Sequence, residues 1–197
     1  SFDIGIEKSF LNLGLDIDAS YFNVKYHDTL EGWKASSWAT QNHSGTVKSQ
    51  GFELISKWKK SETLNFDLNY TYSSTYDGAE ADDPDKNENY TNSQMVRVPR
   101  NIVNLATNVK IPGYKNLDLT LNTKWSDMAR DYGNGNRTWQ DESLDDYLVN
   151  DLSIKYNLWD MYNLSFDINN ILDEKYETTR DYSQMDRSFN FGIRRVY

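Results

Sequence analysis

Hydrophobic and polar residues alternate along most of this chain with a period of two, as in a β-strand whose faces meet different surroundings. Residues 64–72 are the clearest example, because Leu, Phe and Tyr hold the even positions and Asn, Asp and Thr the odd ones. No stretch keeps the period of about 3.6 that an amphipathic helix requires. The pattern predicts about nine strands. Their hydrophobic positions are Phe2, Ile4, Ile6 and Phe10; Leu13, Leu15, Ile17, Ala19 and Tyr21; Phe52, Leu54 and Trp58; Leu64, Phe66, Leu68, Tyr70 and Tyr72; Val103, Leu105, Val109 and Ile111; Leu117, Leu119, Leu121 and Trp125; Leu148, Leu152, Ile154, Tyr156 and Leu158; Leu164, Phe166, Ile168 and Leu172; and Phe189, Phe191, Ile193 and Tyr197.

The connections between these expected strands alternate in length. This rhythm is typical of an up-and-down barrel in an outer membrane, where short turns face the periplasm and long loops face outside. A soluble β-sandwich keeps its long loops at one end only where that end is a binding surface. The short connections are expected at 11–12, 60–62, 112–116 and 160–163, and the long polar ones at 28–43, 77–95, 131–146 and 174–187.

The composition agrees with strands that are half polar. Hydrophobic residues make up only 38% of the 197 residues, yet aromatic residues reach 14%. Disordered chains are poor in aromatics, so this combination favours an ordered β-protein. No run of about 20 apolar residues exists, which argues against a transmembrane helix. A membrane-spanning strand needs only about 9–11 residues, so insertion through strands stays open.

Tyr and Trp gather near the ends of the expected strands. The alternation alone fits a barrel with either face outward, but rings at strand ends suit a water–lipid boundary. Their placement favours an apolar face that looks outward, although aromatic residues are also frequent in the cores of ordinary β-proteins. The expected girdle consists of Tyr21, Tyr26, Trp58, Tyr70, Tyr72, Trp125, Tyr147, Trp159 and Tyr162.

Charge and residue types exclude several functions. The net charge of −9 argues against a nucleic-acid partner, because a phosphate backbone attracts a basic surface. The chain has no Cys, which removes disulfides, thiolate metal sites and thiol catalysis. His27 and His43 are the only histidines, and neither has a spacing partner for a metal site or a catalytic triad. We predict that the chain is not an enzyme.

The last strand carries a further signal. Residues 188–197 place Phe189, Phe191, Ile193 and Tyr197 on one face and end on that aromatic residue, as closing strands of bacterial outer-membrane barrels do. Counting back through the connections makes the first expected strand run in the same direction. Because such barrels have an even number of strands and lipid does not tolerate open edges, we expect this chain to be the C-terminal part of a larger barrel.

Three segments carry a resemblance to a known family. Gly45–Leu54, Val98–Asn101 and Asn169–Tyr176 are similar, in that order, to recurring strand segments of TonB-dependent outer-membrane receptors. The aromatic closing strand follows at the expected distance. Together these matches extend over residues 42–197, so the chain resembles the C-terminal portion of such a receptor.

The resemblance implies an all-β fold, an antiparallel up-and-down transmembrane β-barrel of about 22 strands. Residues 1–197 would be its C-terminal nine strands, without the plug domain. The resemblance also implies the outer membrane of a Gram-negative bacterium, contact with its lipid, and energising by the TonB–ExbB–ExbD complex through the N-terminal part. The imported ligand would be a small molecule such as an iron–siderophore or another metal chelate, haem or cobalamin.

Several polar and small residues have an expected role in the wall. Gly51 would let a neighbouring group approach closely, and Pro99 suits the start of a strand, where no ladder donor is needed. Asn170 and Asp173 are turn formers near the end of a strand. The polar positions expected to line the lumen are Asp67, Asn69, Thr71, Asp118, Thr120, Asn122, Lys124, Asp167 and Asn169.

The long loops hold the candidate ligand-binding residues. Trp33, Trp38, Tyr90, Tyr132 and Trp139 are aromatic residues that could stack on the flat face of a siderophore, corrin or sugar. The alternative is that they pack the loops against one another.

One acidic loop invites a calcium hypothesis. Asp83, Asp85, Asn87 and Asn89 supply oxygen atoms at every second position, and oxygen is the ligand that calcium prefers. The glycine of the helix–loop–helix calcium motif is absent from this stretch, so a solvated loop without calcium is the alternative. Apart from this calcium, we expect no cofactor.

Two other functions remain open at this stage. A porin-like or adhesin-like barrel would share the closing strand and loop rhythm but would lack a plug. A soluble, secreted glycan-binding β-domain would bury Leu64, Phe66, Leu68, Leu119 and Leu121 inside a compact body. The burial of these five residues therefore discriminates between a membrane wall and a soluble domain.

Overall fold

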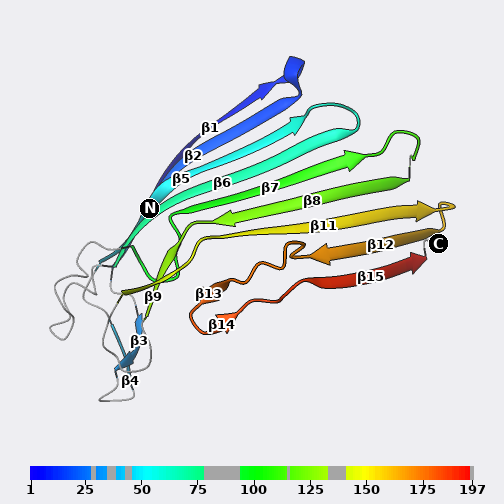
Figure 1. Ribbon diagram of the computed structural model, residues 1–197. Coiled ribbons are helices and arrows are strands. Elements are labelled where there is room, and N and C mark those ends of the chain that lie inside the picture. The colour runs from blue at the N-terminus through cyan, green and yellow to red at the C-terminus, as the bar shows by residue number, and fades with distance from the viewer. Residues whose placement is uncertain are drawn as a thin grey trace.

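The computed structural model describes residues 1–27, 30–34, 39–42, 46–77, 94–114, 116–132 and 141–195. Its main feature is one curved antiparallel sheet of nine strands (Figure 1). The strand order is β1-β2-β5-β6-β7-β8-β11-β12-β15, so each strand pairs with the sheet strands before and after it in sequence. This confirms the expected number of strands and their up-and-down arrangement. The strands are β1 (Phe2–Phe10), β2 (Leu15–His27), β5 (Thr46–Lys59), β6 (Leu64–Asp77), β7 (Asn101–Lys110), β8 (Leu117–Ser126), β11 (Tyr147–Leu158), β12 (Tyr162–Asn169) and β15 (Ser188–Arg195).

The two ends of the sheet differ as the connection lengths predict. The long connections meet at one end, here called the loop end, and the short turns lie at the other, the turn end (Figure 1). β1 and β15 run in the same direction, toward the turn end. Three two-stranded sheets lie within the long connections. They pair β3 (Leu30–Lys34) with β4 (Ala39–Asn42), β9 (Ala129–Tyr132) with β10 (Asp141–Leu144), and β13 (Glu177–Thr179) with β14 (Tyr182–Ser183).

Three of the four short turns contain left-handed backbone conformations, which occur at Gly14, at Gly113, and at Trp159 with Asp160. The first is a 3₁₀ turn, η1 (Leu11–Leu13), which ends at Gly14 with φ of 60° and a hydrogen bond from the Gly14 N–H to the Leu11 carbonyl. The expected break at 11–12 is therefore longer by two residues, and β2 begins at Leu15 rather than at Leu13. Between β11 and β12, both Trp159 and Asp160 have positive φ, the geometry that matches the twist of a tight hairpin.

The register gives the sheet two chemically distinct faces. On β8 and β11, Leu119 lies opposite Ile154 and Leu121 opposite Leu152, while the residues between them pair polar with polar. The same parity continues through all nine strands, and we call the two sides the apolar face and the polar face. The residues expected in the lumen all lie on the polar face, namely Asp67, Asn69, Thr71, Asp118, Thr120, Asn122, Lys124, Asp167 and Asn169.

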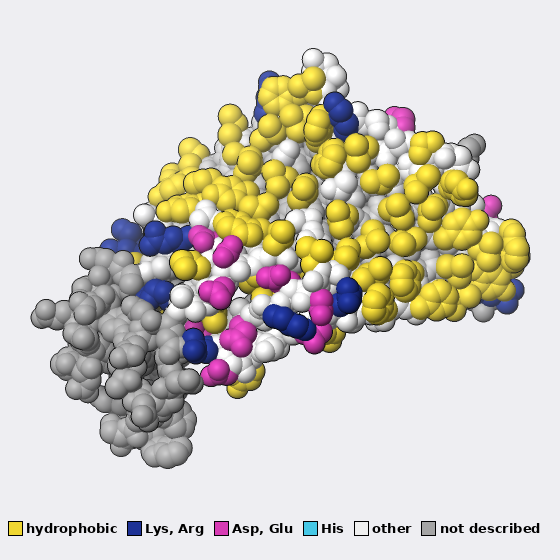
Figure 2. Space-filling model, in the orientation of Figure 1, with side chains coloured by type: hydrophobic (Ala, Val, Ile, Leu, Met, Phe, Trp, Pro, Cys, Tyr) yellow, Lys and Arg dark blue, Asp and Glu magenta, His cyan; other side chains and the backbone are white. Residues whose placement is uncertain are grey.

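The apolar face is open to its surroundings. Figure 2 shows hydrophobic side chains spread as a broad band over the strands. The test residues Leu64, Phe66, Leu68 and Leu119 are only partly covered, and Leu121 is 37% exposed. Within the described residues, the buried hydrophobic side chains are Leu144, Tyr147 and Val149, near the loop end. No helix in the described part of the chain is long and apolar enough to cross a membrane. The five test residues are therefore not sealed inside a core within the described part of the chain.

Two expected girdle residues lie on the other face. Tyr147 pairs with Ser126 on the polar face and is 8% exposed, whereas its neighbour Leu148 pairs with Trp125 on the apolar face. Tyr26 lies on the polar face as well, because it has the same even numbering on β2 as Asp16 and Asp18. The prediction was wrong for Tyr147 and Tyr26 because it used their position along the strand and not the face on which alternation places them. The other girdle residues in the sheet lie on the apolar face, which places Tyr21, Tyr70, Tyr72 and Trp125 toward the loop end and Trp58 and Tyr162 toward the turn end.

Gly51 has the role expected for it. A Cβ atom at this position would lie 1.9 Å from the Tyr72 carbonyl oxygen and 2.9 Å from the Phe22 ring carbon Cζ. Phe22 lies directly opposite Gly51 on the polar face, so the ring occupies the space that a side chain would need. The position therefore requires Gly because the wall is approached closely there. Pro99 lies two residues before β7, outside the ladder, which agrees with its expected place.

Candidate functional site at the loop end

The site residues predicted from the sequence lie in the long connections, and the side chains of all five aromatic candidates are outside the described parts of the chain. Trp33 is in β3 and Tyr132 in β9, but their side chains are outside the described parts. Trp38, Tyr90 and Trp139 are outside the described residues, as are the calcium candidates Asp83, Asp85, Asn87 and Asn89. The site described below is formed by other residues of the same end.

Gln94 fixes the segment before β7 to the end of β6. Its side chain is 7% exposed, and its Oε1 accepts the N–H of Thr75 at 2.9 Å. Its Nε2 donates to the carbonyls of Ser73 at 3.0 Å and Val98 at 3.2 Å. The Met95 N–H in turn donates to the Thr75 hydroxyl at 2.9 Å. A single buried amide therefore satisfies backbone groups on two segments that would otherwise lack partners.

A buried carboxylate holds three loop segments together. Asp131 on β9 is 2% exposed, and its Oδ1 accepts the Arg97 Nε–H at 2.8 Å while its Oδ2 accepts the Arg180 N–H at 2.7 Å. Arg130 Nη1 donates to the Gln94 carbonyl at 2.6 Å. We call Gln94, Arg97, Arg130, Asp131 and Arg180 the Asp131 cluster. A buried carboxylate needs such partners, because an uncompensated charge in this place would cost several kcal/mol.

An aromatic pair lies beside this cluster on the polar face. The rings of Tyr147 and Tyr176 are 4.3 Å apart between centroids, and Lys124 Nζ lies 5.6 Å from the Tyr147 centroid. Burial raises the pKa of the Tyr176 hydroxyl above its usual range, so this ring stays neutral at physiological pH. The pair joins the connection after β12 to the beginning of β11.

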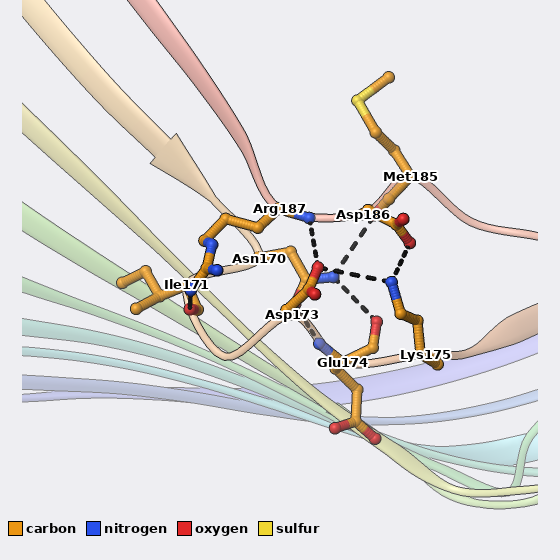
Figure 3. A network of polar contacts seen from close by, with 8 residues as sticks. All are labelled: Asn170, Ile171, Asp173, Glu174, Lys175, Met185, Asp186 and Arg187. Atoms are coloured by element: carbon orange, nitrogen blue, oxygen red, sulfur yellow. Dashed lines mark hydrogen bonds and ion pairs between the residues drawn. The ribbon is translucent and has the colours of Figure 1, made fainter.

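Asn170 organises the turn that follows β12 (Figure 3). It is 4% exposed and has a φ of 52°, a left-handed conformation that Asn tolerates better than most residues. Its N–H donates to Asp151 Oδ1 at 2.7 Å, and its Oδ1 accepts the Glu174 N–H at 2.8 Å. Its Nδ2 donates to the Glu174 carbonyl at 2.9 Å and to the Met185 carbonyl at 3.4 Å. The role expected for Asn170 as a turn former is confirmed.

Asp173 extends this network on the exposed side (Figure 3). It also has a positive φ, of 55°, and its Oδ1 accepts the Arg187 N–H at 2.8 Å. That hydrogen bond, with the nearby Lys175 ammonium, lowers the pKa of the Asp173 carboxyl below its usual value. The ion pair of Lys175 Nζ with Asp186 Oδ1, at 2.5 Å, raises the pKa of the lysine. The turn is thereby fastened to the chain leading into β15.

An open groove of about 850 Å³ lies between the start of β11 and this connection. Tyr176, Lys175 and Arg180 line it together with several carboxylates, among them Asp146 and Glu174. No group of three or more His, Cys, Asp or Glu among the described residues is placed to hold a metal ion. The arrangement presents hydrogen-bonding groups and a ring pair around an open space, which suits reversible binding of a polar molecule more than covalent chemistry.

Sequence reasoning missed the Asp131 cluster. Its members lie 34 and 49 residues apart in sequence, in connections where the alternation stops, so no periodicity relates them. The signal for Tyr147 was present, because Leu148, Leu152 and Ile154 fix the parity of β11 and leave Tyr147 on the opposite face.

A family model described as the β-barrel of TonB-dependent receptor-like proteins matches residues 1–171. No curated protein sequence matches the chain. Several solved structures resemble it in fold. The ferripyoverdine receptor of the Pseudomonas aeruginosa outer membrane, solved with bound ferripyoverdine, is 19% identical with a TM-score of 0.73, and the match covers 97% of this chain and 26% of the receptor.

Two further structures give the same result. The FrpB iron transporter of Neisseria meningitidis is 17% identical, with a TM-score of 0.74 and coverage of 97% of this chain and 30% of the transporter. The ferric-catecholate import receptor Fiu of E. coli K12 is 12% identical, with a TM-score of 0.72 and coverage of 97% and 26%. The chain thus spans between a quarter and a third of the length of these proteins.

Proposed function

We propose that this chain, which belongs to the β-barrel part of the TonB-dependent receptor family, forms wall and ligand-binding loops of an outer-membrane importer. The observation that carries the proposal is the family match over residues 1–171, on a sheet whose apolar face is open and whose polar face is densely hydrogen-bonded. The apolar face would contact lipid, and the polar face would line the barrel interior.

Residues 1–197 would be the C-terminal part of this barrel in the outer membrane of a Gram-negative bacterium. The loop end would face outside and the turn end the periplasm, as long and short connections do in such barrels. On β6, the apolar positions from Leu64 to Tyr72 cover roughly 26 Å along the strand, or roughly 20 Å along the membrane normal at a strand tilt of about 40°. That height supports the proposal, because it covers most of the apolar band of an outer-membrane barrel, which is about 25 Å tall.

The imported ligand would be a scarce metal chelate such as an iron–siderophore. Two of the similar structures are described as iron or ferric-siderophore importers and a third was solved with ferripyoverdine, which supports this class over haem or cobalamin. The Asp131 cluster and the Tyr147–Tyr176 pair would hold the loops in position. Trp33, Trp38, Tyr90, Tyr132 and Trp139 remain the candidates for ligand contact, and Asp83, Asp85, Asn87 and Asn89 for calcium. The TonB–ExbB–ExbD complex would energise the cycle through the plug-bearing part of the receptor.

The test is ferric-siderophore uptake by cells that carry the intact protein. Deleting the gene under iron limitation should abolish uptake of at least one ⁵⁵Fe-labelled siderophore from a panel of hydroxamates and catecholates. Restoring the wild-type gene should recover it, and collapsing the proton-motive force should stop it again. Unchanged uptake of every siderophore would refute the proposal, and uptake that persists without the proton-motive force would indicate a porin.

A variant links the site to this activity. Asp131→Ala removes the acceptor that holds Arg97 and Arg180, so we expect reduced uptake with the receptor still present in the outer membrane. Asp3→Asn, which changes an exposed carboxylate at the loop-end start of β1 and away from the groove, should keep uptake near the wild-type level.

A further inference from the structure

The apolar face does not end at its aromatic residues toward the loop end. On β2, β5 and β6 the residues Tyr21, Phe52 and Tyr72 lie directly opposite one another and form an aromatic row. The next row on the same face consists of Asn23, Gln50 and Ser74, and the row beyond it of Lys25, Lys48 and Tyr76. The sequence of rows is thus aromatic, then amide and hydroxyl, then cationic.

The spacing of these rows matches the layers of a membrane surface. Residues two apart on a strand are about 7 Å apart along it. With a strand tilt of about 40°, the lysine row lies roughly 10 Å beyond the aromatic row along the membrane normal. The polar layer on each side of the hydrocarbon core is about 5–8 Å thick. If the aromatic row marks the edge of the hydrocarbon, the backbone of Lys25 and Lys48 lies just beyond this polar layer, and the long lysine side chains can reach back to the lipid phosphates.

The side chains of these rows are held at the surface. Asn23 Nδ2 donates to Gln50 Oε1 at 3.3 Å, which ties β2 to β5 in the middle row. Lys48 Nζ lies 5.3 Å from the centroid of the Tyr76 ring, and both lysines are exposed. In Figure 2, Lys and Arg side chains gather where the hydrophobic band meets the loop end. The ammonium groups are therefore available to a molecule that lies against this face.

The loop end of the apolar face on β2, β5 and β6 is positively charged, although the chain as a whole is negative. The chain has a net charge of −9, yet the described positions of the apolar face on β2, β5 and β6 beyond the aromatic row include no Asp or Glu. Lys25 and Lys48 lie directly opposite each other, an arrangement of like charges that destabilises a sheet. An anion between them would relieve that repulsion.

We propose that Lys25 and Lys48 form a binding site for the phosphate group of an outer-leaflet lipid headgroup, with Tyr76 and the Asn23–Gln50 pair beneath it. The acyl chains of the same lipid would lie on Tyr21, Phe52 and Tyr72. The inference rests on the proposed placement of the apolar face in the outer membrane. A lipid, rather than free phosphate, is the occupant because the aromatic row lies on the same face two rows below the charged row and fits an attached hydrocarbon chain.

The experiment uses the intact protein in detergent micelles doped with lipid A, the phosphorylated glycolipid of the outer leaflet. Binding is measured by native mass spectrometry and by the shift in thermal unfolding. Each lysine near a phosphate layer contributes about fivefold in affinity, so Lys25→Gln with Lys48→Gln should weaken lipid A binding by about 10- to 30-fold. Dephosphorylated lipid A should bind the wild type and this variant equally.

The matched control removes two charges from the turn end. Lys8 and Lys60 also lie near aromatic rings, Phe10 at 5.9 Å and Trp58 at 4.8 Å. Lys8→Gln with Lys60→Gln should leave lipid A binding unchanged. Equal binding by the wild type and the Lys25, Lys48 variant would overturn the proposal, as would an equal loss in the control. Competition by millimolar inorganic phosphate alone would also overturn it, since it would indicate a site for a soluble anion.

Failure of this site and failure of the proposed function give different results. If only the lysine site is wrong, the protein still requires detergent and supports siderophore uptake, but its lipid A binding ignores the substitutions. If the membrane placement is wrong, the intact protein is monomeric without detergent and uptake does not depend on it.

Discussion

The two faces of β8 and β11 have the same backbone and opposite chemistry. On the apolar face Leu119 and Leu121 pair with Ile154 and Leu152, and their side chains remain partly or largely open. On the polar face, one residue along, Thr120 lies opposite Ser153 and forms a hydrogen bond at 2.9 Å to Asn108 on β7. Ser153 donates in turn to Asp167 on β12 at 2.6 Å. Polar groups here satisfy one another across strands, whereas the apolar groups contact only their neighbours on the same face and stay partly exposed above them.

The two faces differ in the opposite way from the two faces of a strand in a soluble domain. In a soluble domain the apolar half of a strand is covered by a second layer and the polar half meets water. Here the hydrogen-bonded half is the better-connected one, and no second layer of the described chain covers the apolar half, which lipid would cover under the proposed function. The next three experiments test that difference, and the largest effect is expected from reversing it.

Placing a charge on the apolar face should have the largest effect. Leu121→Lys in the middle of β8 should lower the unfolding free energy of the intact protein in lipid vesicles by about 2–4 kcal/mol, because the ammonium would enter hydrocarbon. Asn122→Lys, on the polar face one residue away, should change it by less than about 0.5 kcal/mol. Denaturant titration of both variants measures the difference, and equal losses would contradict the assignment of the faces.

Adding a methyl group to the polar face at Gly51 should have a smaller but clear effect. The new Cβ would lie 1.9 Å from the Tyr72 carbonyl oxygen, so the backbone must move, and we expect a loss of about 1–3 kcal/mol. Gly5→Ala is the control, because its Cβ would meet the Ala19 carbonyl oxygen at 3.4 Å and has nearly enough room. Thermal unfolding of the two variants side by side decides this, and a neutral Gly51→Ala would mean that the strands there are farther apart.

Acidification should have the smallest effect, confined to the turn after β12. The hydrogen bond from the Arg187 N–H holds the pKa of the Asp173 carboxyl below its usual value of 3.8, so the stability that it contributes is present above that value and is lost as the pH falls through the folded pKa. Hydrogen exchange of the Arg187 N–H should accelerate over that window beyond its intrinsic pH dependence. Asp173→Asn should remove this extra acceleration. A wild-type amide that keeps its protection under acid would refute the role of the carboxylate.

Much of the wall was predictable because alternation reports burial directly. Residues 64–72 could only place Leu64 to Tyr72 on one face and Asn65 to Thr71 on the other, and Gly51 and Asn170 stood out as residues suited to close approach and to a left-handed turn. The odd or even position of Tyr26 and Tyr147 in their strands also predicts the face on which each ring lies, whereas the residue type and the position along the strand predict the wrong face.

The loop end was not predictable in the same way. Asp131 is buried because Arg97 and Arg180 reach it from distant connections, and one carboxylate among the chain's 30 acidic residues has no local mark of that role. Gln94 likewise becomes buried only through backbone groups of Ser73 and Val98. Such contacts depend on how the connections fold back over the strands, which the period of two does not encode.

The uninterrupted strand order has a consequence for biogenesis. Since every strand of the sheet pairs with the sheet strands that precede and follow it in sequence, the wall can be assembled one hairpin at a time, each new strand templated by the free edge of the last. Loop-closure entropy then stays low at every step, because each pairing closes only the turn or connection between two consecutive strands of the sheet. The lengths of those connections, rather than distant pairings, would set the pace at which the wall is built.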